Sequence, residues 1–83
     1  MQPENIKQLI ETQLPGSTAM VSSPDNVHFT AIVISDLFIN KSKLQQQQLV
    51  NQAIQQYITD GTIHALSLKT FTPEAWEANK TAS

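Results

Sequence analysis

A long helical pattern across residues 42–61 constrains the fold of this chain more than any other feature of its sequence. Ser42 and Gln45 have the spacing of a capping box, and Gly61 directly after Asp60 is typical of the residue that follows a helix. Apolar residues between these ends recur at the spacing of one helix face: Leu49, Val50, Ala53, Ile54, Tyr57 and Ile58. The other face is almost entirely glutamine: Gln45, Gln46, Gln47, Gln48, Gln52, Gln55 and Gln56. We interpret it as a solvated face of the helix rather than a low-complexity tract.

This helix lies between two segments that are predicted to be strands. Residues 27–35 are rich in β-branched side chains and apolar on both faces toward their end, as in a central strand. Residues 63–71 alternate imperfectly between apolar and polar side chains. Because a helix that joins two neighbouring strands makes a right-handed crossover, we expect these two strands to be parallel.

Shorter elements complete the predicted fold. Residues 3–14 form an amphipathic helix that Pro15 and Gly16 end, and residues 17–23 form a weak strand that a short turn joins to the next as a hairpin. Thr72 and Pro73 begin a last helix over residues 73–79. The order α-β-β-α-β-α predicts an α/β (α+β) domain with a three-stranded mixed sheet and helices packed on one face.

The chain is short enough to be one domain over residues 1–83. We expect the ordered core to cover about residues 3–79 and the tail of residues 80–83 to be frayed, since ends that are not tied down are poorly ordered. The sequence has no internal repeat and no linker that would divide it.

The chain contains no cysteine, which excludes a thiolate nucleophile, a redox pair and a cysteine zinc site. An iron–sulfur cluster held by this chain would therefore need thiolates from a partner. The sequence also carries no serine nucleophile motif, phosphate loop or H-E-x-x-H motif, and its carboxylates are scattered. We therefore expect a protein that is not an enzyme.

Charge and hydropathy limit the partners. Five basic residues, all lysines, stand against seven acidic ones, so strong non-specific binding to nucleic acid is not expected. No apolar run is long enough to cross a membrane, and the first residues lack the pattern of a signal peptide. The expected location is the cytoplasm.

Three segments resemble a known family. V-H-F at residues 27–29 and V-I-S-D-L-F at residues 33–38 are similar to the Ser/Gly-His-Phe and V-S-x-x-F patterns of BolA proteins. I-H-A-L-S-L-K-T-F-T-P-E-A-W at residues 63–76 resembles the closing signature of that family. The resemblance covers about residues 5–80 and is greatest to the short bacterial subgroup typified by YrbA/IbaG.

This resemblance implies a class II KH-like fold and a partnership with a monothiol glutaredoxin. In such pairs a [2Fe-2S] cluster is bridged between the two proteins, with thiolates from the glutaredoxin and glutathione and the histidine of the I-H-A motif, here His64. No cofactor is expected in the isolated protein. The implied role is iron–sulfur cluster trafficking or iron and stress regulation.

Other site residues and functions remain open at this point. Many relatives carry a second His or Cys ligand in the loop between the first two strands, and residues 22–26 contain neither. His28 is either a second ligand or a hydrogen-bonded residue that holds the hairpin. Lys41, Lys43 and Lys69 are candidates for contacts with phosphate or an acidic partner, or simply solvated surface.

Two alternative functions use other surfaces of the same fold. The first is a DNA-binding transcriptional regulator that uses the KH-like face, although the G-x-x-G loop by which KH domains clamp nucleic acid is missing. The second is a module that forms a homodimer.

Overall fold

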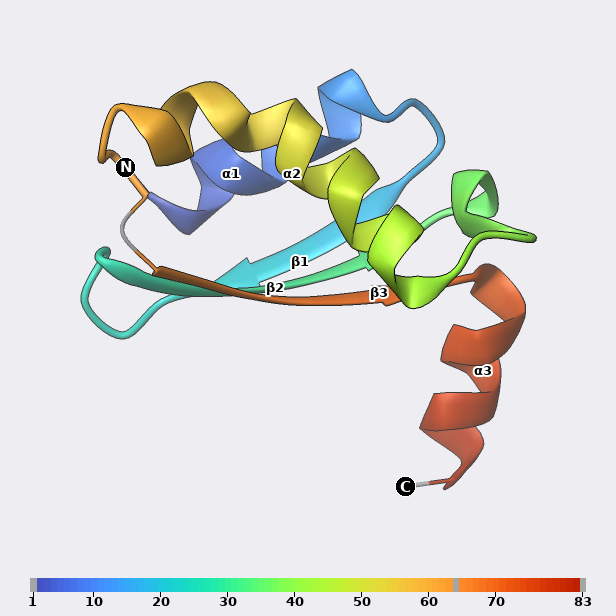
Figure 1. Cartoon of the computed structure of the whole chain (residues 1–83). Coiled ribbons are helices and arrows are strands. Elements are labelled where there is room, and N and C mark those ends of the chain that lie inside the picture. The colour runs from blue at the N-terminus through green and yellow to red at the C-terminus, as the bar shows by residue number, and fades with distance from the viewer. Residues whose placement is uncertain (1, 64, 83) are drawn as a thin grey trace.

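The computed structural model describes residues 2–63 and 65–82, with the backbone alone at residues 81 and 82. Its elements in chain order are α1 (Pro3–Gln13), β1 (Thr18–Ser22), β2 (His28–Ile34), the 3-10 helix η1 (Asp36–Phe38), α2 (Lys43–Thr59), β3 (Ala65–Phe71) and α3 (Pro73–Ala82) (Figure 1). This order confirms the predicted one and adds η1, a single turn too short to show a helical periodicity in the sequence.

The sheet has the predicted topology. Its strand order is β1-β2-β3, with β1 antiparallel and β3 parallel to the central β2. Met20 of β1 lies opposite Ile32 of β2, which pairs on its other side with Lys69 of β3. The hairpin and the crossover through α2 are therefore both confirmed.

The core fills the space between one face of the sheet and the pair of helices α1 and α2 (Figure 1). The partly buried Leu66 and Leu68 of β3 pack against it, and its buried residues come from α1, β1, β2, η1, α2 and two loop positions: Ile6, Ile10, Leu14, Ala19, Phe29, Val33, Phe38, Val50, Ile54 and Ile63. Buried and exposed residues alternate along β1 and β2. Since α1 and α2 cover one face of the sheet, the exposed residues lie on the opposite face. None of the described helices is long and apolar enough to span a membrane.

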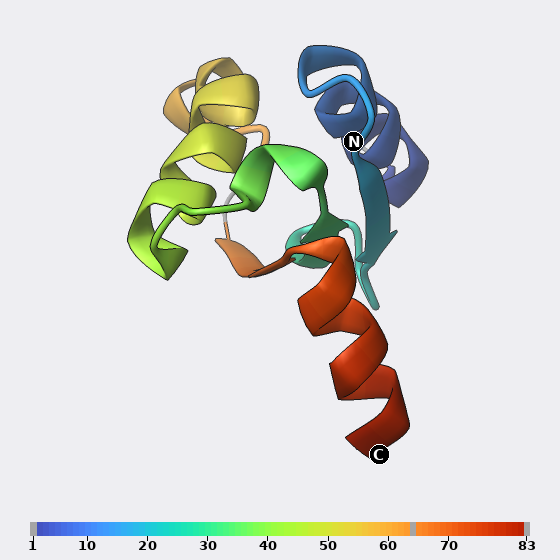
Figure 2. The same cartoon turned by 90° about the vertical axis from the view of Figure 1, so that its right-hand side faces the viewer.

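The last helix is placed differently from the other two. α3 leaves the end of β3 on the side of the sheet opposite to α1 and α2 (Figures 1 and 2). Trp76 packs its ring against Phe71, with centroids 5.3 Å apart, and so anchors α3 to β3 rather than to the core. The helix also continues to Ala82, past the expected end at residue 79, with Lys80 paired to Glu77 at 3.7 Å one turn earlier.

The ends of α2 follow from local chemistry. The Ser42 hydroxyl accepts the N–H of Gln45 at 3.1 Å, and the Gln45 side chain accepts the N–H of Ser42 at 2.9 Å, as a capping box requires. Gly61 has a φ of +83°, which a residue with a Cβ adopts only under strain, and it ends the helix after Asp60.

Two residues of α2 contradict the predicted division into an apolar and a solvated face. Gln46 is buried, with 6% of its surface exposed, because its amide fills a polar gap between η1 and β3. Ile58 is 42% exposed instead of packed, because the last turn of α2 extends beyond the core. The other predicted apolar positions are buried or partly buried.

Glu11 ties α1 to the first strand. Its Oε2 accepts the backbone N–H of Ala19 at 2.9 Å and the ammonium of Lys7 at 2.5 Å. These donors, the Ala19 N–H foremost, hold the pKa of Glu11 below its ordinary value of 4.5. Because the lowered pKa belongs to the folded state, this carboxylate stabilises the fold above its ordinary pKa, and the contribution is lost as pH falls through the folded pKa.

Glu11→Gln is therefore expected to lower the free energy of unfolding by about 1 kcal/mol at neutral pH, since it removes a charge-assisted hydrogen bond. The deficit should begin to shrink as the pH falls below 4.5 and should vanish below the lowered pKa of the folded state, where the wild-type carboxyl is neutral as well. Urea unfolding at several pH values measures both, with Glu4→Gln on the exposed side of α1 as the control. A deficit that does not change with pH would contradict this assignment.

Candidate functional site

The turn between β1 and β2 is built around the carboxylate of Asp25. Its Oδ1 accepts the backbone N–H groups of Val27 and His28, both at 2.9 Å. Its Oδ2 lies 2.8 Å from Nδ1 of the His28 ring. One carboxylate thus binds the backbone of the turn with one oxygen and the imidazole with the other.

Ser23 closes the same turn from its other side. Its hydroxyl accepts the N–H of Asn26 at 2.8 Å and donates to the backbone carbonyl of His28 at 2.5 Å. Asn26 has a φ of +61°, in the left-handed region that asparagine tolerates better than most residues. The sequence Ser-Pro-Asp-Asn therefore fixes the backbone directly before His28.

The electrostatics of the turn keep Asp25 ionised. The backbone N–H of His28, its side chain and the N–H of Val27, in that order, hold the pKa of Asp25 well below its usual range. Because the two side chains are 68% and 46% exposed, His28 and Asp25 form a surface ion pair when the imidazole is protonated. The other ring nitrogen of His28, Nε2, has no partner among the described residues.

His28 is the only predicted metal ligand that the structure describes. His64 lies outside the described residues. Its neighbours are described: Ile63 is buried in the core, and Ala65 begins β3. Ala65 pairs with His28 across the parallel ladder, at the end of the sheet away from α3 (Figure 1). The turn that carries His28 therefore lies at the same end of the sheet as the start of β3.

The donor set of the chain fits only part of a metal centre. Within residues 2–63 and 65–82, no three His, Cys, Asp or Glu side chains lie close enough to hold an ion together. The whole sequence has two histidines and no cysteine. The histidines of this chain could therefore supply at most two ligands to a metal or cluster at this surface.

The three candidate lysines are not equivalent. Lys43 donates from Nζ to the backbone carbonyl of Thr70, and this nitrogen lies 4.6 Å from the centre of the Phe71 ring. Lys41 and Lys69 are exposed, and their ammonium groups make no hydrogen bond or ion pair among the described residues. Lys43 thus has a role within the fold, and the other two are available at the surface.

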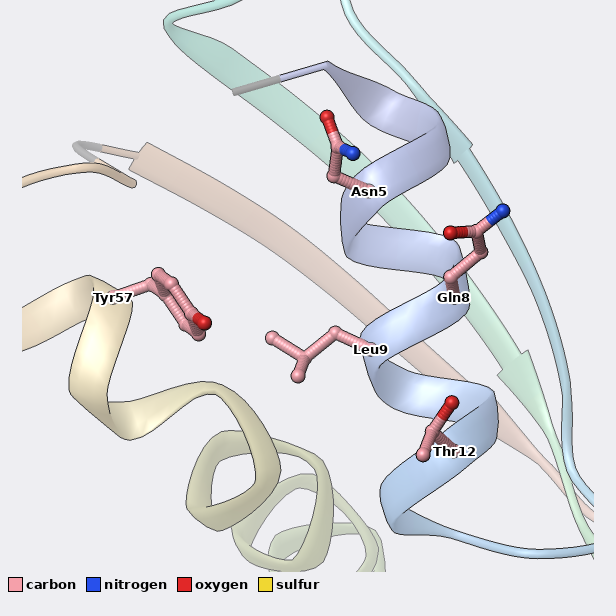
Figure 3. A pocket seen from close by; sticks show the side chains of 5 residues that line it. All are labelled: Asn5, Gln8, Leu9, Thr12 and Tyr57. Atoms are coloured by element: carbon pink, nitrogen blue, oxygen red, sulfur yellow. The ribbon is translucent and has the colours of Figure 1, made fainter.

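The hollow between α1 and α2 is a weak candidate for catalysis. It has a volume of about 370 Å³, and its lining side chains come from both helices: Asn5, Gln8, Leu9, Thr12 and Tyr57 (Figure 3). Tyr57 and Leu9 point across the gap toward one another, and the polar groups of Asn5, Gln8 and Thr12 lie along α1 (Figure 3). The lining contains no carboxylate, histidine or lysine, and Tyr57 is its one titratable side chain.

Sequence reasoning missed the role of Asp25. Asp25 lies in the short turn that the sequence predicts between the two strands, but its second oxygen also binds the ring of His28. The signal was present in the sequence, since an aspartate three residues before a histidine and next to a left-handed asparagine can reach both the backbone and the ring.

Comparisons with known proteins agree on one family. Residues 8–75 match the family model described as BolA-like protein. The chain is 38% identical over 58 residues to the acid stress protein IbaG of Escherichia coli, covering 70% of this chain and 69% of that protein. It is 39% identical over 51 residues to the DNA-binding transcriptional regulator BolA of Haemophilus influenzae, covering 61% and 48%.

A solved structure supports the same grouping. The BolA protein homologue from Coxiella burnetii superposes with a TM-score of 0.81 at 38% sequence identity, covering 93% of this chain and 97% of that one.

Proposed function

This chain belongs to the BolA-like protein family, and from that premise we propose that it is a non-catalytic adaptor that pairs with a monothiol glutaredoxin. In this pair it shares a [2Fe-2S] cluster, to which the glutaredoxin and glutathione contribute thiolates and His64 contributes an imidazole. The cluster is the cargo of the pair, so the role lies in iron–sulfur trafficking or in the regulation of iron and stress responses.

The metal-binding side chains in this sequence are the main support for this proposal. With two histidines and no cysteine, the chain can supply imidazole but never thiolate. His28 lies at the surface with its Nδ1 bound to Asp25 and its Nε2 without a partner among residues 2–63 and 65–82, so it is a second candidate ligand. Imidazole in place of thiolate raises the reduction potential of a [2Fe-2S] centre, which would distinguish a shared cluster from one held by thiolates alone.

Reconstitution tests the proposal. Iron and sulfide are added to an equimolar mixture of this protein, a monothiol glutaredoxin and glutathione, and the species that elutes as a heterodimer is examined by visible absorption and circular dichroism. We expect a spectrum that differs from that of the glutaredoxin homodimer. The proposal is wrong if only the glutaredoxin homodimer carries cluster and no heterodimer forms.

Regulation of transcription is the second candidate, because one relative is named a DNA-binding transcriptional regulator. Lys41 and Lys69 are the surface cations available for phosphate contacts. This function requires binding to duplex DNA that weakens with added salt and again in Lys41→Ala and Lys69→Ala variants. A mobility shift that is absent even at low salt would eliminate it. Light scattering over a concentration series tests the remaining alternative, a homodimer.

A further inference from the structure

We propose that Asp25 is a positioning residue, which holds His28 with its proton on Nδ1 and so presents Nε2 as a second imidazole ligand to the shared cluster. This inference rests on the function proposed above. It assigns a role to a carboxylate that is not itself expected to touch the cluster.

The hydrogen-bonding capacity of the two groups determines the tautomer. An ionised carboxylate only accepts hydrogen bonds, so the contact of 2.8 Å between Oδ2 of Asp25 and Nδ1 of His28 requires a proton on Nδ1. In the neutral ring the lone pair is then on Nε2, the nitrogen left free for a metal. Metal-binding histidines commonly have this arrangement, with the second ring nitrogen donating to a carboxylate or carbonyl oxygen.

The carboxylate is held in place independently of the ring. Its Oδ1 accepts two backbone N–H groups, from Val27 and His28, and the Ser23 hydroxyl separately binds the backbone of Asn26 and His28. The turn therefore closes without the imidazole. Since an exposed ion pair adds little to stability, the contact between the ring and Oδ2 is better explained by orientation of the ring than by the need to hold the hairpin.

The position of His28 in the sheet suits a ligand supplied to a partner. It is the first residue of β2, and because the next residue, Phe29, is buried in the core, its side chain projects from the face opposite to α1 and α2. The ring is 68% exposed, which leaves room for a second protein. Its ladder partner Ala65 follows His64 directly in the sequence.

Asp25→Asn separates orientation of the ring from closure of the turn. The asparagine Oδ1 can still accept the N–H groups of Val27 and His28, which keeps the turn. Its Nδ2 then faces the ring and donates to Nδ1, so the proton moves to Nε2. In the isolated protein, nitrogen-15 chemical shifts of the neutral His28 ring are expected to report the proton on Nδ1 in the wild type and on Nε2 in the variant.

The second measurement uses the mixed complex itself, reconstituted with a monothiol glutaredoxin and glutathione. Loss of cluster to an iron chelator is expected to be about tenfold faster or more for Asp25→Asn and for His28→Ala, the size of effect typical of a lost outer hydrogen bond at a metal site. In a His28→Ala background Asp25→Asn should have no further effect. Asp36→Asn, which changes an exposed carboxylate in η1, is the matched control and should behave as the wild type.

The outcomes distinguish this inference from the function on which it rests. If the wild-type mixed cluster forms but Asp25→Asn and His28→Ala lose it at the wild-type rate, the inference is wrong and the adaptor function stands. A wild-type ring with its proton on Nε2 would also overturn the inference. If the wild type forms no mixed cluster, both the inference and the proposed adaptor function are wrong.

Discussion

Gln46→Ala is expected to lower the free energy of unfolding by about 2–4 kcal/mol, because it removes three hydrogen bonds and leaves the buried Thr70 hydroxyl and the Lys41 carbonyl without their partner. The Gln46 amide nitrogen donates to the carbonyls of Lys41 at 2.9 Å and Phe38 at 3.3 Å. Its oxygen accepts the hydroxyl of Thr70, itself buried, at 2.8 Å. One side chain thus joins the segment after β2 to α2 and β3.

Two further variants make this prediction specific to the amide. Gln48→Ala, on the exposed side of the same helix, should change the free energy of unfolding by no more than about 0.5 kcal/mol. Gln46→Glu keeps the shape but replaces the donor with an oxygen that faces two carbonyl oxygens, so it should be at least as destabilising as alanine. Urea unfolding measures the free energy of unfolding of all three variants. Equal stabilities of Gln46→Ala and Gln48→Ala would show that the buried network contributes nothing.

His64→Ala is expected to have the largest effect on function. If the imidazole of His64 is the main ligand from this chain, its removal should reduce the mixed cluster recovered with the heterodimer by about tenfold or more, because a lost ligand costs at least as much as a lost outer contact. Visible circular dichroism of the fraction that elutes as a heterodimer measures this loss.

Thr30→Ala is a suitable control for that experiment, since Thr30 is exposed on the same side of β2 as His28. It should retain the mixed cluster, and urea unfolding should show that both variants are folded. Recovery of cluster from His64→Ala at the wild-type level would exclude the histidine as a required ligand.

Local chemistry explains why much of the fold could be predicted. The capping pair Ser42 and Gln45 and the left-handed Gly61 act within a few residues of themselves, so the ends of α2 follow from the sequence alone. The parallel pairing of β2 and β3 follows from one connection, the crossover through that helix. The arrangement of β2, α2 and β3 could therefore be predicted from local sequence signals and one connection.

The features that could not be predicted depend on distant residues. Nothing in a run of four glutamines marks Gln46 as the buried one, because its burial depends on carbonyls of Phe38 and Lys41 and on Thr70. The side of the sheet on which α3 lies depends in the same way on the contact of Trp76 with Phe71. In the candidate site, His28 was identified from the sequence, but its orientation by Asp25 needed the three-dimensional turn.

Pulsed EPR of the mixed complex tests most directly whether this chain supplies imidazole to the cluster. The complex is assembled twice, with nitrogen-15 histidine or ordinary histidine in this chain only, and reduced by one electron. We predict strong nitrogen couplings to the cluster that change with the isotope in this chain. Spectra that are identical for the labelled and unlabelled chain would contradict the account, since they would show that no histidine of this protein binds the cluster.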